Sequence, residues 1–84
     1  MKYKYTINDR EVTEEEYYSS EDGIHRRYHF NGQLEYEIPY QNGQAHGVAK
    51  WYYSNGQLYF EIPYQNGQRH GVMKEYETIQ IHNQ

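Results

Sequence analysis

A block of 24 residues occurs twice in this chain, and this repeat constrains the fold more than any other feature. Residues 28–51 and 52–75 match at 17 of 24 positions, and both contain the octapeptide EIPYQNGQ. Self-similarity at a fixed period of roughly 20–50 residues is typical of repeat architectures, in which each unit packs against its neighbours. The repeat therefore predicts one structural unit that is built twice.

Each copy contains two Asn-Gly pairs, which occupy positions 31–32 and 42–43 in the first copy and 55–56 and 66–67 in the second. Asn-Gly between alternating apolar residues is the strongest short signal for a β-hairpin, because a two-residue type I′ turn needs a positive φ at both central residues. We therefore expect two-residue turns at all of these pairs. They predict an all-β fold, a single antiparallel meander of about six or seven strands in one twisted sheet.

The predicted turns also decide which residues lie opposite each other across the sheet. The apolar face carries two rows, which consist of Leu34, Trp51, Phe60 and Met73 and of Tyr36, Ala49, Ile62 and Gly71. On the other face Arg26 lies opposite Glu37, and Lys50 lies opposite Glu61, as cross-strand charge pairs. Proline donates no ladder hydrogen bond, so the proline of each octapeptide marks either a bulge, which would shift this register, or the last pairing before the turn.

We interpret residues 1–84 as one domain with two parts of different character. Residues 1–22 are a degenerate, acidic segment, and residues 23–76 hold the hairpins of the 24-residue period. The stretch GVMKEYETIQI, which begins at the end of the second copy, predicts a long edge strand that closes the sheet.

The acidic segment allows two interpretations. Asn8-Asp9 predicts a turn between the strand KYKYTI and a second strand, REVTEEEYY. The alternative is a short helix, because Thr13 and Glu16 have the spacing of a capping box. We expect the strand, since Asn8 precedes Asn31 by 23 residues, close to the period of the repeat.

The two copies share the pattern Y-x-x-N-G-Q-L-x-x-E-x-x-Y-x-N-G-x-x-x-G. It is present at Tyr28, Asn31, Gly32, Gln33, Leu34, Glu37, Tyr40, Asn42, Gly43 and Gly47, and again at Tyr52, Asn55, Gly56, Gln57, Leu58, Glu61, Tyr64, Asn66, Gly67 and Gly71. This pattern resembles the MORN repeat, in the variant form common in bacterial proteins. The resemblance implies a row of β-hairpins that acts as an interaction scaffold. Small bacterial members are often described as antitoxin or immunity components, and eukaryotic members are linked to membrane association and to the assembly of larger proteins.

The excess of acidic charge lies in the first quarter of the chain. The formal net charge is −4, and residues 1–24 carry three basic and seven acidic groups, whereas residues 25–84 carry five of each. An acidic field repels nucleic acid and anionic lipid and favours a partner with a basic protein surface. We therefore expect a protein partner and neither direct nucleic-acid binding nor membrane binding.

Composition also indicates the compartment. The chain has no cysteine, no apolar run as long as a membrane span and no apolar region of a secretory signal at its N-terminus. Small secreted domains are usually stapled by disulfides. We expect a soluble, cytoplasmic protein.

The histidines and serines do not form a recognisable catalytic or metal-binding motif. His25 and His29 lie four residues apart on a predicted strand, about 13 Å, which is too far to share an ion. His46 and His70 occupy equivalent repeat positions without a second ligand on the same strand. Nothing places a serine beside a base that a third group orients. We expect no enzyme, no cofactor and no metal site.

Tyrosine accounts for 12 of the 84 residues, and one sheet cannot bury both of its faces. Tyrosine and tryptophan suit a binding face because they offer large, rigid area with a polar tip. We expect a small antitoxin, immunity-type or phage-encoded inhibitor that neutralises a toxin, nuclease or defence enzyme by stoichiometric binding. The alternative is a scaffolding module that self-associates as a homodimer through its open face. The predicted partner contacts are Glu14, Glu15, Glu16, Tyr17, Tyr18, Tyr36, Trp51 and Tyr53.

Overall fold

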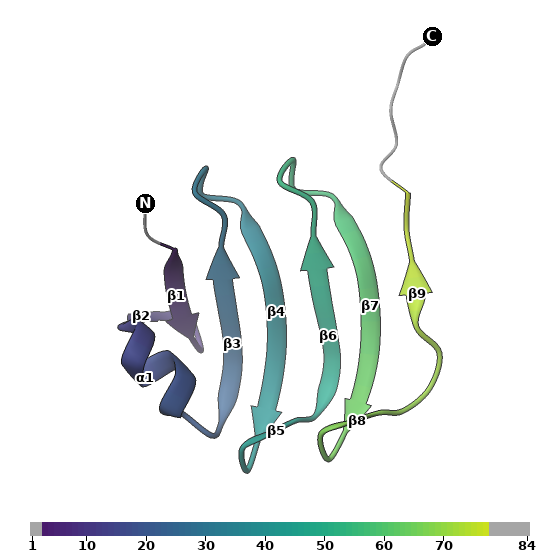
Figure 1. Ribbon diagram of the computed structural model, residues 1–84, viewed down its shortest axis with the longest axis horizontal. Helices are drawn as coiled ribbons and strands as arrows, with labels where there is room; N and C mark the ends of the chain where they lie inside the picture. The colour runs from purple at the N-terminus through teal and green to yellow at the C-terminus, as the bar shows by residue number, and fades with distance from the viewer. Residues whose placement is uncertain (1–2, 78–84) are drawn as a thin grey trace, which may run out of the picture.

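Antiparallel strands follow one another in a single open sheet in the computed structural model, which describes residues 3–77 (Figure 1). The elements are β1 (Lys4–Ile7), β2 (Arg10–Val12), α1 (Glu14–Ser19), β3 (Gly23–Tyr28), β4 (Leu34–Gln41), β5 (Gln44–Ala45), β6 (Gly47–Tyr52), β7 (Leu58–Gln65), β8 (Gln68–Arg69) and β9 (Lys74–Glu75). The strand order is β2-β1-β3-β4-β6-β7-β8, with β5 paired to β4 and β9 paired to β7. The predicted all-β meander is confirmed.

Three two-residue turns have the backbone that the sequence predicts. Both central residues have positive φ at Asn8-Asp9 (50° and 68°), Asn42-Gly43 (53° and 77°) and Asn66-Gly67 (53° and 83°). These values are typical of type I′ turns, whose twist matches that of the flanking strands. The turn between β1 and β2 is therefore confirmed along with two of the four Asn-Gly turns.

The Asn-Gly pairs at 31–32 and 55–56 form a different turn, and the expectation of two-residue turns there is wrong. Only the glycine of each pair has positive φ. The side-chain oxygens of Asn31 and Asn55 accept hydrogen bonds at 2.9 Å from the backbone amides of Gln33 and Gln57. An asparagine side chain that bonds to the backbone two residues ahead replaces part of the turn, and the loop becomes wider.

A bulge follows each wider turn. In the second copy Trp51 pairs with Phe60, as predicted. The next pair joins Tyr52 to Leu58 instead of Tyr59, so Tyr59 is an extra residue in β7. The β3–β4 pairing has the same irregularity.

The register between the repeats differs from the prediction by two residues. Next to the tight turn, Tyr40 pairs with Ala45 as predicted. Farther along, Trp51 pairs with Tyr36 and not with Leu34. The observed row across the sheet consists of Tyr5, Arg27, Tyr36, Trp51, Phe60 and Glu75. Because side chains alternate with a period of two, a shift of two residues does not by itself move a side chain to the other face.

The shift coincides with a contact between a proline and a glycine. Gly47 and Gly71 have φ values of 122° and 110°. A Cβ on Gly47 would lie 2.9 Å from Cγ of Pro39, and one on Gly71 would lie 3.2 Å from Cγ of Pro63. The prolines of the octapeptide therefore mark the register change, and only a residue without a side chain fits opposite them.

The face opposite the aromatic residues carries charges of alternating sign. One row across the sheet consists of Thr6, Arg26, Glu37, Lys50, Glu61 and Lys74. Nε of Arg26 donates to Oε1 of Glu37 at 2.8 Å, and Arg26 also pairs with Asp9. The predicted positions of Arg26 opposite Glu37 and of Lys50 opposite Glu61 are confirmed, and Arg26 and Glu37 form an ion pair. A cross-strand ion pair of this kind contributes roughly 0.2–1 kcal/mol.

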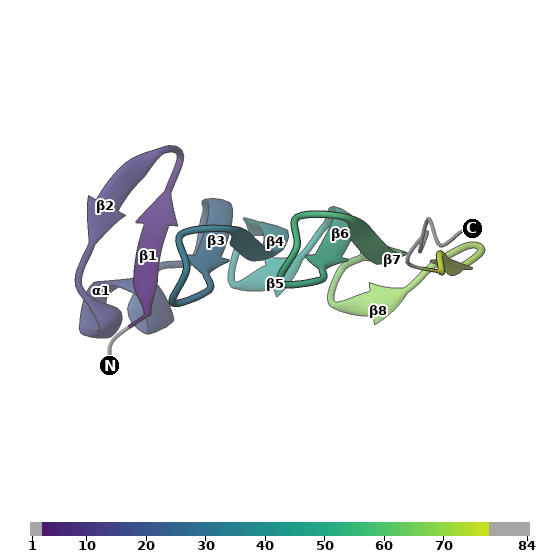
Figure 2. The same ribbon diagram turned by 90° about the horizontal axis from the view of Figure 1, so that it is seen from above.

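After β2 the chain forms a helix, so the expected strand over REVTEEEYY ends at Val12 and the alternative is correct. Oγ1 of Thr13 caps α1 by accepting from the amide of Glu16 at 3.1 Å. The helix buries Tyr17 against Tyr5 and Ile7. Figure 2 shows that the sheet is a single layer from β3 to β9, whereas β2 and α1 add depth at the N-terminal end.

The expected long edge strand is also shorter than predicted. Of the described residues 71–77 in this stretch, only Lys74–Glu75 form a strand, which pairs with β7. The end of the predicted strand, residues 78–81, lies outside the described residues.

We expect Gly47→Ala to lower the free energy of unfolding by about 1–3 kcal/mol, because the new Cβ combines a strained φ with a clash against Pro39. Gly32→Ala is the matched control, since its φ is 90° but no atom lies within 4 Å of an added Cβ. Urea unfolding followed by circular dichroism measures both variants. Equal losses in the two variants would show that the proline contact is unimportant.

Candidate protein-binding face

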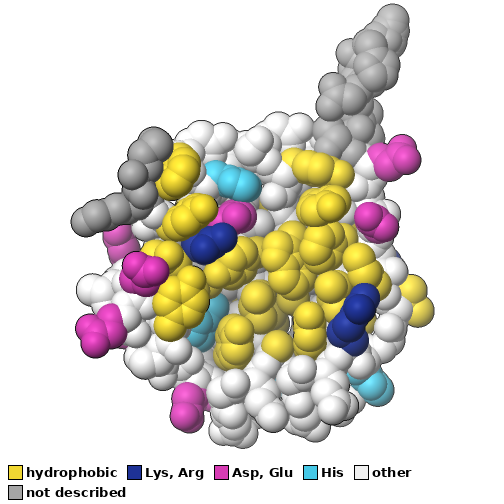
Figure 3. Space-filling model, in the orientation of Figure 1, with side chains coloured by type: hydrophobic (Ala, Val, Ile, Leu, Met, Phe, Trp, Pro, Cys, Tyr) yellow, Lys and Arg dark blue, Asp and Glu magenta, His cyan; other side chains and the backbone are white. Residues whose placement is uncertain are grey.

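The apolar side of the sheet forms a continuous surface across the central strands (Figure 3). We call this surface the aromatic face and define it by Tyr36, Trp51, Tyr53, Tyr59 and Phe60. Trp51 stacks on Phe60 with ring centroids 4.7 Å apart and packs beside Tyr36 at 6.4 Å. Tyr59 contacts Tyr53 at 4.7 Å and Phe60 at 4.6 Å. The rings therefore form one connected layer.

The aromatic face is covered only at its N-terminal end. The core cluster of Tyr5, Ile7 and Tyr17 joins α1 to β1, and Tyr36 packs against it. Trp51 and Phe60 are half-buried, and none of the residues in the range 3–77 forms a second layer over them. An apolar surface of this kind on a soluble protein is typical of an interaction site.

The structure divides the predicted contact residues of the acidic segment into two groups. Glu14, Glu15 and Glu16 are exposed in the first turn of α1. Tyr18 is 63% exposed, whereas Tyr17 is only 4% exposed and belongs to the core. Tyr17 therefore has no surface to offer a partner in this conformation, and the other four residues do.

The predicted contacts on the sheet lie together. Tyr36, Trp51 and Tyr53 are all part of the aromatic face, and Tyr36 and Tyr18 line one cavity beside α1. Sequence reasoning missed Tyr59, because only the bulge brings its ring beside Phe60. Nothing in a single sequence indicates that bulge, since it follows from the wider turn.

Arg27 is a charged residue that lies against the rings of Tyr3 and Tyr36. Its Nε and Nη2 donate to the two carboxylate oxygens of Glu35 at 2.7 and 3.0 Å. Its guanidinium lies 4.0 Å from the ring centre of Tyr3 and 5.0 Å from that of Tyr36. The hydrogen bonds to Glu35 are the largest cause that raises the pKa of Arg27. The face thus accommodates a cation between tyrosine rings and a carboxylate.

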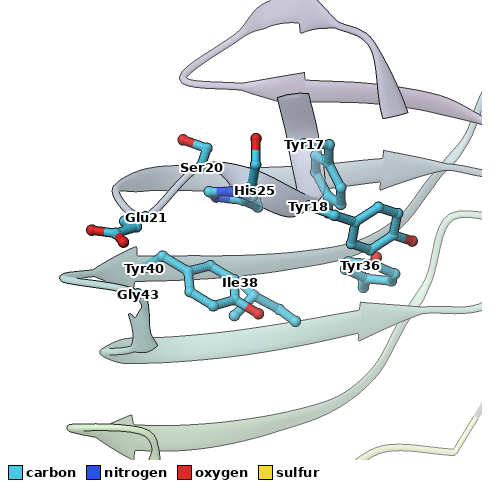
Figure 4. Close-up of a pocket in the computed structure, with 10 residues that line it drawn as sticks. Tyr17, Tyr18, Ser20, Glu21, His25, Tyr36, Ile38, Tyr40 and Gly43 are labelled. Carbon is cyan, nitrogen blue, oxygen red and sulfur yellow. The ribbon is translucent and has the colours of Figure 1, made fainter. Parts of the chain in front are cut away.

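A cavity of about 320 Å³ lies between α1 and the sheet (Figure 4). Its lining consists of the rings of Tyr17, Tyr18, Tyr36 and Tyr40, of His25 and Ile38, and of backbone and side chains from residues 19–21 and 43. His25 is 3% exposed and lies between two rings, with centroid distances of 5.0 Å to Tyr17 and 4.6 Å to Tyr40. The sequence favoured a structural or solvent-facing histidine over a metal ligand, and the structure shows that His25 is buried in the core.

The described residues contain no cluster of metal-ligating side chains. Over residues 3–77 no group of three or more His, Asp or Glu side chains could hold an ion. The expectation of no cofactor stays a prediction. Within the same range the helix spans six residues, and no helix is long and apolar enough to cross a membrane.

Comparison with known proteins agrees with this architecture. Residues 21–42 and 45–66 each match the family described as MORN repeat variant, so the two matches cover about half of the chain. The chain belongs to the MORN repeat variant family. The matches start 24 residues apart, which is the period of the sequence repeat. No curated protein and no solved structure matches the chain.

Buried tyrosines make the stability of the fold sensitive to alkaline pH. Burial is the main cause that raises the pKa of Tyr5, Tyr17 and Tyr36, and the neighbouring Tyr36 hydroxyl adds to the effect at Tyr17. The unfolded chain has the ordinary tyrosine pKa of 10.0. Above that pH the unfolded chain loses a proton that the folded chain keeps, so the stability present below pH 10 is lost as the pH rises.

We expect the free energy of unfolding to fall above about pH 10, with Tyr17 contributing about 1.4 kcal/mol per pH unit and Tyr5 and Tyr36 adding to the decline. Tyr17→Phe removes one of these groups and makes the decline shallower. Urea unfolding between about pH 8 and 11 measures how steeply the free energy of unfolding falls with pH in the wild type and in Tyr17→Phe. The difference between their free energies of unfolding at about pH 8 gives the cost of the substitution itself. Identical slopes would contradict the assignment to Tyr17.

Proposed function

We propose that this protein is a non-catalytic module that binds another protein stoichiometrically through the aromatic face. The observation that carries this proposal is the connected layer of half-exposed rings on one side of an open sheet. Tyrosine and tryptophan are enriched at the energetic centres of protein interfaces. A MORN repeat architecture is consistent with a binding or scaffolding module.

The acidic first turn of α1 lies beside this face and favours a basic partner. Glu16 pairs with Arg10 at 2.9 Å, whereas Glu14 and Glu15 are exposed in the same turn. Acidic groups at the rim of an interface steer a basic partner and speed association, and they repel nucleic acid and anionic lipid. The partner in our proposal is a cytoplasmic toxin, nuclease or defence enzyme, and the protein is its antitoxin, immunity-type or phage-encoded inhibitor.

A scaffolding role is the second candidate, and the sheet edge favours it. β9 pairs with β7 and ends the sheet, so its outer side has no strand beside it among the described residues. An open edge or the aromatic face would allow a second copy to bind. Light scattering separates the candidates, since a dimer that persists at low micromolar concentration supports scaffolding and a monomer supports the inhibitor.

We expect Trp51→Ala to weaken partner binding at least tenfold, because it removes the central ring of the face. The partner is obtained by photo-crosslinking from a benzoylphenylalanine at position 59 and is then purified for calorimetry. Lys50→Ala is the matched control, since Lys50 is the neighbouring residue in β6 on the charged face. Equal affinities for Trp51→Ala and the wild type would rule out the aromatic face as the interface.

We expect the triple substitution Glu14→Lys, Glu15→Lys and Glu16→Lys to slow association about tenfold or more at low salt. Raising the salt concentration should narrow the difference, because screening weakens steering. Stopped-flow fluorescence measures the rates, with Glu77→Lys as a control outside the acidic segment. Unchanged and salt-insensitive association would contradict docking through α1.

A further inference from the structure

The cavity between α1 and the sheet is rich in hydrogen-bond acceptors, and its lining contains no lysine or arginine. Its volume of about 320 Å³ lies at the lower end of the range of ligand pockets, roughly 300–1,000 Å³. That space is large enough for one side chain of a partner protein. The chemistry of the lining decides which side chain fits.

His25 supplies an acceptor that has no partner among residues 3–77. Its Nδ1 lies 3.2 Å from the carbonyl oxygen of Gly23. Because a carbonyl oxygen only accepts, Nδ1 carries the hydrogen, and Nε2 of the neutral ring is an acceptor. This Nε2 is buried without a hydrogen bond from the part of the chain that the structure describes. A buried acceptor of this kind favours the entry of a group with N–H donors.

The segment that follows α1 adds more acceptors. The hydroxyls of Ser19 and Ser20 donate their hydrogens to backbone carbonyls at 3.3 and 3.5 Å, which leaves the hydroxyl oxygens free to accept. Glu21 brings a carboxylate to the end of the cavity beside Tyr40 (Figure 4). The carbonyl of Glu21 accepts from the amide of Gly43 at 2.8 Å, so the turn after β4 holds this segment in place.

The same sheet already shows how such surroundings bind a cation. The guanidinium of Arg27 lies over the rings of Tyr3 and Tyr36 and donates two hydrogen bonds to Glu35. The cavity offers the same two components, tyrosine rings and a carboxylate, and Tyr36 lines it as well. What the cavity lacks is a cation of its own.

We propose that this cavity binds the guanidinium of an arginine side chain from the partner protein. The guanidinium would lie beside the ring of Tyr40, with its N–H groups directed to Glu21 and His25, and the rest of the arginine side chain would extend past Tyr18 (Figure 4). Arginine fits better than lysine because its planar, weakly hydrated group stacks on aromatic rings and carries several donors in one fork. This inference rests on the proposed protein-binding function and names one contact that the basic partner makes.

Titration with N-acetyl-arginine amide tests the site without the partner. We expect saturable NMR shifts of the His25 ring nitrogens and the Tyr18 and Tyr40 rings, with a dissociation constant of about 1–10 mM. N-acetyl-citrulline amide has nearly the same shape without the charge, and it should leave these signals unchanged. Glu21→Gln should weaken arginine binding about tenfold, whereas Glu77→Gln, remote from the cavity lining, should not.

Other outcomes decide against the site. Equal shifts with the citrulline and arginine amides would show that charge is not recognised. If the NMR signals of the His25 ring nitrogens do not shift at the highest concentration of arginine amide, arginine does not enter the cavity. Equal binding of N-acetyl-lysine amide would overturn the preference for a guanidinium.

The purified partner separates this inference from the proposed function. We expect Glu21→Gln and Tyr18→Ala each to weaken the complex about tenfold. Neither change removes the core, because Tyr18 is exposed on α1 and Glu21 is exposed in the segment after it. If Trp51→Ala weakens the complex but both cavity variants bind like the wild type, the arginine site is wrong and the aromatic face stands. If Trp51→Ala also has no effect, the proposed function itself fails.

Discussion

The contact between a proline ring and a glycine backbone aligns the strands on which the rest of the structure depends. Gly47 has a φ of 122° and approaches Pro39 more closely than any side chain would allow. At that point the pairing between the repeats moves by two residues relative to the tight turn. Because strand side chains alternate with a period of two, the shift preserves both faces and changes only the neighbours. Trp51 therefore lies between Tyr36 and Phe60 in a row of aromatic rings.

A single sheet with one apolar face needs a cover, and this chain supplies only part of one. α1 buries Tyr17 against the N-terminal strands, while the rings on β6 and β7 stay half-exposed. On the opposite face the charges alternate in sign from strand to strand, so each charged side chain lies beside one of opposite charge. The charged face is covered by its own ion pairs, whereas the aromatic face is only partly covered, and this difference is the physical basis of the binding function that we propose. The cavity at the edge of α1 joins the two surfaces that we expect a basic partner to contact.

Predictions from the sequence succeeded where a few neighbouring residues determine the backbone. The turn at 42–43 followed from Asn-Gly alone, but the same dipeptide at 55–56 formed a wider loop because the Asn55 side chain bonded to the backbone of Gln57. The strand expected over REVTEEEYY was wrong, since the cap from Thr13 and the burial of Tyr17 favour a helix. The candidate site was predicted in part. Two adjacent tyrosines do not reveal which one faces the sheet until the helix and its orientation are known.

By itself, the sequence determined the repeat, the tight turns and the division into an apolar and a charged face. These features depend on spacing within one repeat, which a single chain displays directly. Only the tertiary structure decided the register between repeats, the partial cover by α1 and the cavity around His25. Those features depend on close packing between residues distant in the chain, such as Tyr17 and Tyr40 on either side of His25. Such packing changes when a side chain gains or loses one methylene group or when one backbone angle differs. The local sequence pattern of a strand or turn does not contain this information.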